Sequence, residues 1–261
     1  HKIGGYSDPA SDRYLTLFFE EVSACLPEGR MDRAFPEQIL HFLENYRLHQ
    51  ETVRIMEGRW GPFDWRLPET HALYWALEGT RAGGEWPDIR ADRMFYLTLM
   101  ACFLRGRTAM ARVGEPPIRG IRPELADAVL QAMEEVSRRH PDPAYQWEEV
   151  IAMFLKRAAF YLYCYGEKDA AHLFFEKARR AGAVKESSLD EMAVGAAANA
   201  TMAGVDYWDQ SIGMFFEAAR RRLGGDAEGG AHCERMGRLF YEGVRKRLVE
   251  VGVQNLPTAD A

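Results

Sequence analysis

The side chains that could bind a metal or perform catalysis are spread along the chain rather than grouped. Glu37 lies one helical turn before His41, and Glu69 lies two residues before His71. A di-iron centre in a helical bundle needs several inward-facing carboxylates and Glu-x-x-His pairs on different helices, and no Glu-x-x-His spacing is present. We therefore predict no metal site and no cofactor.

Local motifs for hydrolysis, nucleotide binding and zinc proteolysis are missing as well. The sequence contains no Gly-x-Ser-x-Gly, no P-loop, no Gly-x-Gly-x-x-Gly and no His-Glu-x-x-His. An all-helical toroid can still assemble acids from distant helices, and Asp64, Glu69 and Asp92 lie near the most aromatic part of the sequence. Such an enzyme is the alternative to our leading hypothesis, which is a non-catalytic protein with no catalytic residues.

The densest aromatic segment runs from Trp60 to Trp75 and holds three of the six tryptophans. Two prolines keep it extended between helices, so Trp60, Phe63 and Trp65 cannot all lie on one helical stripe. Two interpretations stay open. In the first, these rings and Arg66 bind a partner, since aromatic and arginine side chains are enriched at interfaces. In the second, the rings form a hydrophobic plug that closes the end of the helical stack.

Composition and charge limit the classes of partner. Hydrophobic residues make up 47% of the chain, which is enough apolar surface for a folded protein. The net charge of -6 argues against nucleic-acid binding, which needs a concentrated basic surface. The longest uncharged run, residues 192–205, is shorter than the ~20 residues that cross a bilayer, so we predict no membrane span.

Apolar residues recur at helical spacing along nearly the whole chain, and alternating strand-like patterns are absent. We therefore predict an all-α fold of about ten helices in a single domain over 1–261, with flexible ends at 1–11 and 253–261. The predicted helices span 12–25, 36–57, 69–82, 88–111, 123–139, 144–165, 167–181, 188–203, 207–223 and 230–251. Ser188 followed by Glu191 predicts a capping box at the start of one of them.

Two segments of the chain repeat each other. Residues 174–180 read Phe-Phe-Glu-Lys-Ala-Arg-Arg, and residues 215–221 read Phe-Phe-Glu-Ala-Ala-Arg-Arg. Around them, the pattern Ala171-x3-Phe175-x2-Ala178 recurs 40 residues later as Ser211-x3-Phe215-x2-Ala218. A weaker copy at 91–98 lies twice that distance before the first. A fixed period of this length indicates a repeated helical unit.

These segments resemble the second helix of a tetratricopeptide repeat, in which a small residue precedes an aromatic by four positions, as Ala171 precedes Phe175. Gly166 to Ala171 resembles the turn between the two helices of that repeat. Trp75 with Gly79 resembles the first-helix pattern, with Glu78 in place of leucine. The family's period is ~34 residues, so the helices or connections here would be longer.

The resemblance implies antiparallel helical hairpins stacked as an array or α-α superhelix, with 144–223 as the clearest part. Helix 144–165 should pair with 167–181, and 188–203 with 207–223. In that family the first helix of a hairpin lines a concave binding face, which here implies Met153, Lys156, Phe160 and Tyr163. The resemblance thus favours a protein-protein interaction or assembly subunit.

The partner predicted for this subunit is a protein or peptide of unknown identity, and not a nucleic acid. A cytoplasmic location is favoured, and a membrane-anchored or periplasmic one stays open. Because the chain begins at His1, the sequence leaves open a preceding signal peptide or anchor and, through it, a membrane-associated complex.

Overall fold

The computed structural model describes residues 48–61, 63, 65, 67–82, 89–109, 118–199 and 207–250. Within these residues it contains nine α-helices and one pair of short strands, which confirms the predicted all-α fold of about ten helices. The predicted flexible ends, 1–11 and 253–261, and the predicted helix 12–25 lie outside the described residues.

The described chain divides into two compact units. One takes in the described residues up to Leu99, and the other takes in those from Met100 onward. The boundary falls within a helix, so no linker separates the units along the sequence. The single domain over 1–261 stays a prediction.

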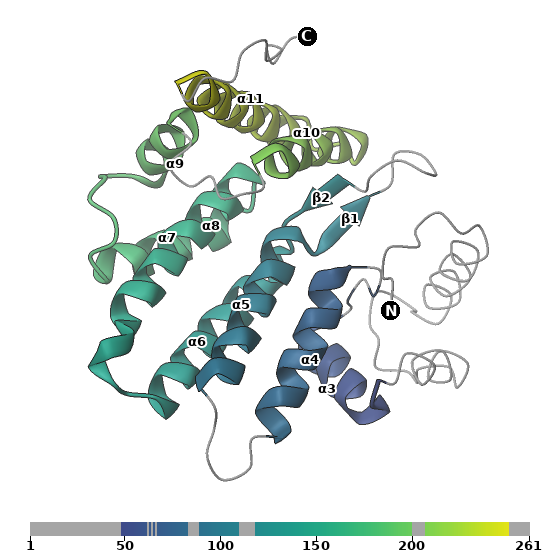
Figure 1. Ribbon diagram of the computed structural model, residues 1–261. Coiled ribbons are helices and arrows are strands. Elements are labelled where there is room, and N and C mark those ends of the chain that lie inside the picture. The colour runs from purple at the N-terminus through teal and green to yellow at the C-terminus, as the bar shows by residue number, and fades with distance from the viewer. Residues whose placement is uncertain are drawn as a thin grey trace, which may run out of the picture. The chain divides into compact units, whose positions relative to one another are not determined.

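The first unit contains α3 (Gln50–Trp60), α4 (Pro68–Ala82) and the beginning of α5 (Ile89–Arg105) (Figure 1). Helix α4 agrees with the predicted 69–82, and its first residue is a proline, whose fixed φ is helical and whose missing N–H has no partner there anyway. Helix α3 extends the predicted end of 36–57 to Trp60. The buried apolar side chains of this unit include Val53, Met56, Leu73, Tyr74, Phe95 and Leu99.

The predicted helix 88–111 is too long, because α5 ends at Arg105. Gly106 follows, and a Cβ there would overlap the carbonyl oxygen of Cys102. The chain then forms β1 (Arg107–Ala109), which pairs antiparallel with β2 (Ile118–Gly120). This pair packs against the second unit's helices: a Cβ at Gly213 would overlap the Arg119 carbonyl oxygen, so glycine permits the close approach of the strand.

The second unit holds six further helices. Five have bounds within three residues of the predicted ones, and α9 ends at Ala198 where the prediction ended at 203. The six helices are α6 (Ala126–Arg139), α7 (Trp147–Cys164), α8 (Lys168–Arg180), α9 (Leu189–Ala198), α10 (Tyr207–Leu223) and α11 (Ala227–Glu250). The predicted capping box is present at α9, where the Ser188 hydroxyl accepts a hydrogen bond from the Glu191 N–H at 3.2 Å. The Glu191 carboxylate accepts the N–H of Ser187, one residue earlier than the motif predicts.

Two helical hairpins, α7 with α8 and α10 with α11, share the same turn (Figure 1). Gly166 ends α7 with φ at 80°, and Gly225 ends α10 with φ at 87°, a left-handed conformation that costs glycine little. In each turn the residue after the glycine donates its N–H five residues back, from Glu167 to Leu162 and from Asp226 to Arg221. These bonds satisfy carbonyls that the helix end leaves without a partner.

The pairing predicted for 188–203 with 207–223 is wrong. Helix α10 packs along α11, and α9 packs against α11 and α7 instead. A shift of 59 residues, from Gly166 to Gly225, also places Ala171 on Gly230 and Ala178 on Gly237, so α8 corresponds to α11 rather than to α10. The repeated Phe-Phe-Glu-x-Ala-Arg-Arg segments are similar as amphipathic helices. The same glycine turn also follows α8, at Gly182, without pairing α8 along α9, so neither signal alone predicts which helices pair.

Aromatic side chains fill the core of the second unit. The Phe154 ring lies 6.2 Å from the Phe174 ring, and the Phe160 ring lies 6.0 Å from the Phe240 ring, measured between centroids. All four side chains are buried. Because burying one such ring contributes roughly 1.5 to 3 kcal/mol, these contacts hold α7, α8 and α11 together as a rigid support for whatever their outer faces do.

Candidate functional site

The predicted interface at the aromatic connection is buried in the structure. Trp60 packs against Phe95 with ring centroids 5.1 Å apart, and Trp65 packs edge-on against Tyr74 at 6.5 Å. Phe63 is buried as well. Arg66, the fourth predicted residue, lies outside the described residues. The three rings are therefore buried, as the second of our two interpretations, the hydrophobic plug, requires. That they close the end of a helical stack stays a prediction.

A carboxylate on the preceding helix holds this connection in place. The Glu57 carboxylate is buried and accepts hydrogen bonds from the Phe63 N–H at 3.1 Å and from the Trp65 indole N–H at 2.5 Å. A charged acceptor strengthens such bonds, so one residue satisfies two donors that the buried rings bring with them. Gly61 leaves room for this carboxylate, because a Cβ there would overlap it. Sequence reasoning missed Glu57, which looks like an ordinary polar residue near a helix end.

Two of the three carboxylates of the enzyme alternative lie in the first unit. Glu69 and Asp92 are buried, and Asp64 lies outside the described residues. Among the residues that the structure describes, His, Cys, Asp and Glu side chains form no group of three that could hold a metal ion.

The four predicted residues of α7 do not form one open surface. Met153 is exposed over 72% of its surface, whereas Phe160 is buried completely. Lys156 makes an ion pair with Glu186 at 3.8 Å between Nζ and Oε1. Tyr163 is buried, and its hydroxyl donates to the Asp190 carboxylate at the start of α9. The sequence placed these four residues on one helix, but it did not predict which of them would be exposed.

Tyr163 nevertheless connects α7 to a second group of polar side chains. Its ring meets the His232 ring edge-on at 4.6 Å, and the backbone carbonyl of Tyr163 accepts from His232 Nε2 at 2.7 Å. Because a carbonyl only accepts, Nε2 carries the proton. Burial, with the hydrogen bond to Asp190, raises the pKa of Tyr163 to about 12. Asp190 also lies 3.5 Å from the Arg235 guanidinium, which leads onto the outer surface of α11.

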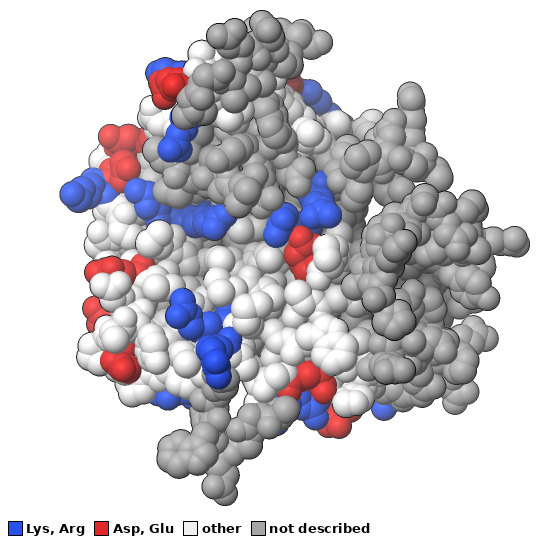
Figure 2. Space-filling model, in the orientation of Figure 1, with Lys and Arg blue, Asp and Glu red and all other residues white. Residues whose placement is uncertain are grey.

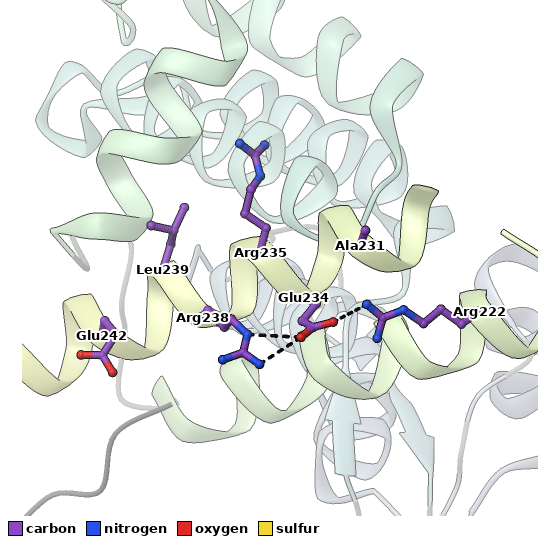
Figure 3. A pocket seen from close by; sticks show the side chains of 7 residues that line it. All are labelled: Arg222, Ala231, Glu234, Arg235, Arg238, Leu239 and Glu242. Carbon is purple, nitrogen blue, oxygen red and sulfur yellow. Dashed lines mark hydrogen bonds and ion pairs between the residues drawn. The ribbon is translucent and has the colours of Figure 1, made fainter. Parts of the chain in front are cut away.

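One side of α11 forms an open, hollowed surface. It carries Ala231, Arg235, Leu239, Glu242, Lys246 and Val249, which together we call the α11 face. Two adjoining cavities of about 460 and 410 Å³ lie along it, and both are lined by Leu239 and Glu242. Figure 3 shows Arg235 and Leu239 projecting from the same side of the helix. Residues on the opposite side, such as Phe240 and Val244, are buried in the core.

The charges beside the α11 face are partly paired with one another. Glu234 lies between Arg222 and Arg238, and ion pairs join it to both (Figure 3). Glu242 is paired with Arg245 at 2.7 Å. Neighbouring arginines thus form ion pairs with two of the glutamates that line the cavities. The charged residues that line the two cavities carry a net positive charge. On the face of the molecule shown in Figure 2, acidic and basic side chains are interspersed among uncharged atoms.

Comparisons with known proteins add no family: no family model, curated protein or solved structure matches the chain. Among the described helices, none combines the length and the apolar composition needed to cross a membrane.

Proposed function

We propose that the protein is a non-catalytic interaction or assembly subunit that binds a partner protein through the α11 face. The observation that carries this proposal is the hollowed, largely exposed side of α11, whose apolar residues alternate with charged ones. Val249 is exposed over 51% of its surface, and two cavities flank Leu239. An open helix side on which apolar side chains lie beside charged ones is the kind of surface that binds a protein segment.

The scaffold supports the same proposal. Two hairpins with matching glycine turns, and small residues at matching positions of α8 and α11, are what a tetratricopeptide-like array is built from. Such arrays expose extended helix surfaces on which partners bind. The repeat unit we infer runs from α7 to α8 and again from α10 to α11.

The enzyme alternative receives less support. Neither of the two cavities along α11 is lined by Glu69 or Asp92, the carboxylates on which that alternative depends. Two of the three acids that line them are held in ion pairs by neighbouring arginines: Glu234 by Arg222 and Arg238, and Glu242 by Arg245. The hydrogen bonds from Arg222 and Arg238 lower the pKa of the Glu234 carboxyl, whereas a general acid requires a raised pKa.

Affinity purification from cells that naturally contain the protein tests the proposal. The wild-type chain and two variants are compared: Leu239→Arg, which places a charge in the groove, and Leu173→Arg, a matched change at an exposed leucine of α8. We expect the wild type and the Leu173 variant to retain the same partner and the Leu239 variant to lose it. Retention of that partner by Leu239→Arg, with all three chains folded by circular dichroism, would refute the proposal.

A further inference from the structure

The spacing of residues on the α11 face matches the seam of a helix pair. Leu239, Glu242, Lys246 and Val249 follow one another at steps of three, four and three residues. This is the 3-4 spacing with which one helix packs its side chains between those of another. Arg235 and Ala231 continue the same side of the helix toward its beginning. Of the four residues in this spacing, Leu239 and Val249 are apolar, so this side of α11 offers two apolar contacts to a helix lying along it.

Two cations on this seam are not neutralised by the glutamates beside them. In the described part of the chain, Arg235 forms one ion pair, with Asp190 at 3.5 Å. Asp190 does not line either cavity. No ion pair joins Lys246 to another side chain among these residues, and Lys246 is exposed. The two residues lie eleven positions apart, which is about three helical turns or ~16 Å along the axis. On this side of the helix they flank Leu239 and Glu242, and Val249 follows one turn after Lys246.

We propose that the α11 face binds an acidic amphipathic helix of a partner protein. Apolar side chains of that helix fill the cavities beside Leu239 and Val249, and two of its carboxylates, about three turns apart, pair with Arg235 and Lys246. This inference rests on the proposed function and adds the chemistry of the partner. Charge complementarity sets the choice: the five basic and three acidic residues that line the two cavities leave a net positive surface on a chain of net charge -6.

The same charges disfavour the other occupants. If a second copy packed its own α11 antiparallel, with Leu239 against Glu242, then Arg235 would face Lys246 across the seam at both ends, and these like charges repel. A nucleic acid would bring its phosphates against the glutamates that alternate with the cations on this face. An acidic helix can instead place carboxylates at the cations and apolar side chains between them.

A designed peptide tests this inference directly on the full chain. The probe is a fluorescein-labelled amphipathic helix of about 18 residues, with leucines at 3-4 spacing and glutamates on both flanks, and the comparison peptide carries lysine in place of every glutamate. Anisotropy titrations measure both affinities. We expect the acidic peptide to bind at least ~10-fold more tightly than the basic one, with affinity falling as salt is added.

Charge reversal on the protein provides the second half of the test. The double change Arg235→Glu and Lys246→Glu should weaken the acidic peptide at least ~10-fold and strengthen the basic one. The matched control is Arg179→Glu with Lys185→Glu, two exposed cations outside the α11 face, which should change neither affinity by more than ~2-fold. Undetected binding of the acidic peptide, equal affinity for both peptides, or indifference to charge reversal would overturn the inference.

Two further arms separate the competing occupants. Sedimentation that shows a dimer of the wild type, lost on Leu239→Arg, would assign the face to a second copy and overturn the inference. Displacement of the acidic peptide by a DNA duplex would overturn the inference as well.

Failure of the inference and failure of the proposed function can be told apart. A natural partner that is lost with Leu239→Arg but kept with the charge-reversed face would overturn the acidic helix alone, whereas a partner kept by both variants would overturn both.

Discussion

The aromatic connection after α3 and the outer side of α11 contrast in both sequence and structure. The first contains Trp60, Phe63 and Trp65 within six residues, and the structure buries all three. The second contains one leucine and one valine among charged residues, and the structure leaves it open with two cavities. Aromatic density therefore did not locate an exposed surface in this protein. The buried Glu57 carboxylate instead accepts hydrogen bonds from the Phe63 N–H and the Trp65 indole, so these rings can be buried without leaving those two donors unsatisfied.

The largest expected effect tests the burial of the aromatic connection. Replacing Trp65 by alanine should lower the free energy of unfolding by ~3 to 5 kcal/mol, because the ring packs against Tyr74 and its N–H is bonded inside the protein. The matched change Trp75→Ala removes an indole that is 56% exposed and should cost about 1 kcal/mol or less. Urea unfolding of both variants measures the difference. Equal costs would mean that Trp65 is not a core residue.

A smaller effect is expected at the carboxylate that holds the connection. Glu57→Gln keeps the shape of the side chain but removes its charge and one of its acceptor oxygens, so we expect a loss of ~1 to 3 kcal/mol. Glu51→Gln on the same helix is the control. Its ion pair with Arg81 is exposed, so the change should cost less than ~0.5 kcal/mol. Urea unfolding compares the two variants through their midpoints, provided that the dependence of the unfolding free energy on urea has the same slope. If Glu57→Gln costs no more than Glu51→Gln, the role assigned to the Glu57 carboxylate is wrong.

The positions of the helices could be predicted well because they depend on local signals. Periodic apolar residues set the interior of each helix, and turn glycines or a starting proline set its ends, so α4 and α10 agree with prediction to within one residue. The short strands β1 and β2 were missed because three residues are too few to show alternation. Their pairing depends on a contact with α10 that lies a hundred residues further along the chain.

The pairing of helices and the site were harder to predict because both depend on contacts distant in sequence. The likeness between 174–180 and 215–221 reflected two amphipathic helices with basic ends, and it did not say that Gly225 would turn α10 back onto α11. On α7 the resemblance placed Met153 and Tyr163 on one binding face, but the first side chain is exposed and the second is buried. It could not show that α11 would cover Phe160 and leave Met153 exposed.

On the α11 face, stability and binding should separate. Leu239→Ala removes a side chain that lines both cavities and is only partly buried, so it should change the free energy of unfolding by about 1 kcal/mol or less. The same change should weaken the acidic peptide several-fold. Chemical denaturation and anisotropy on one sample measure both quantities. A stability loss of ~3 kcal/mol would show instead that Leu239 belongs to the core, and the contrast with the aromatic connection would then disappear.

The smallest expected effect is a pH dependence on the inner side of α11, where His232 meets Tyr163. Burial lowers the pKa of His232, and the positive charges of Arg235 and Lys168 lower it further. The hydrogen bond to the Tyr163 carbonyl and the charge of Asp190 act in the opposite direction but are outweighed. The neutral ring is therefore favoured in the folded state, so its contribution to stability is complete above the unfolded pKa of about 6.5 and is lost as pH falls below it. Glu191, Glu234 and Asp226, whose pKa values are lowered, lose their contributions only below about pH 4.5. The wild type should therefore lose stability between pH 7.5 and 5. The variant His232→Gln should not, because glutamine retains a donor for the carbonyl but does not titrate. Parallel stability profiles for the two proteins over this range would show that the ring is not held neutral by its surroundings.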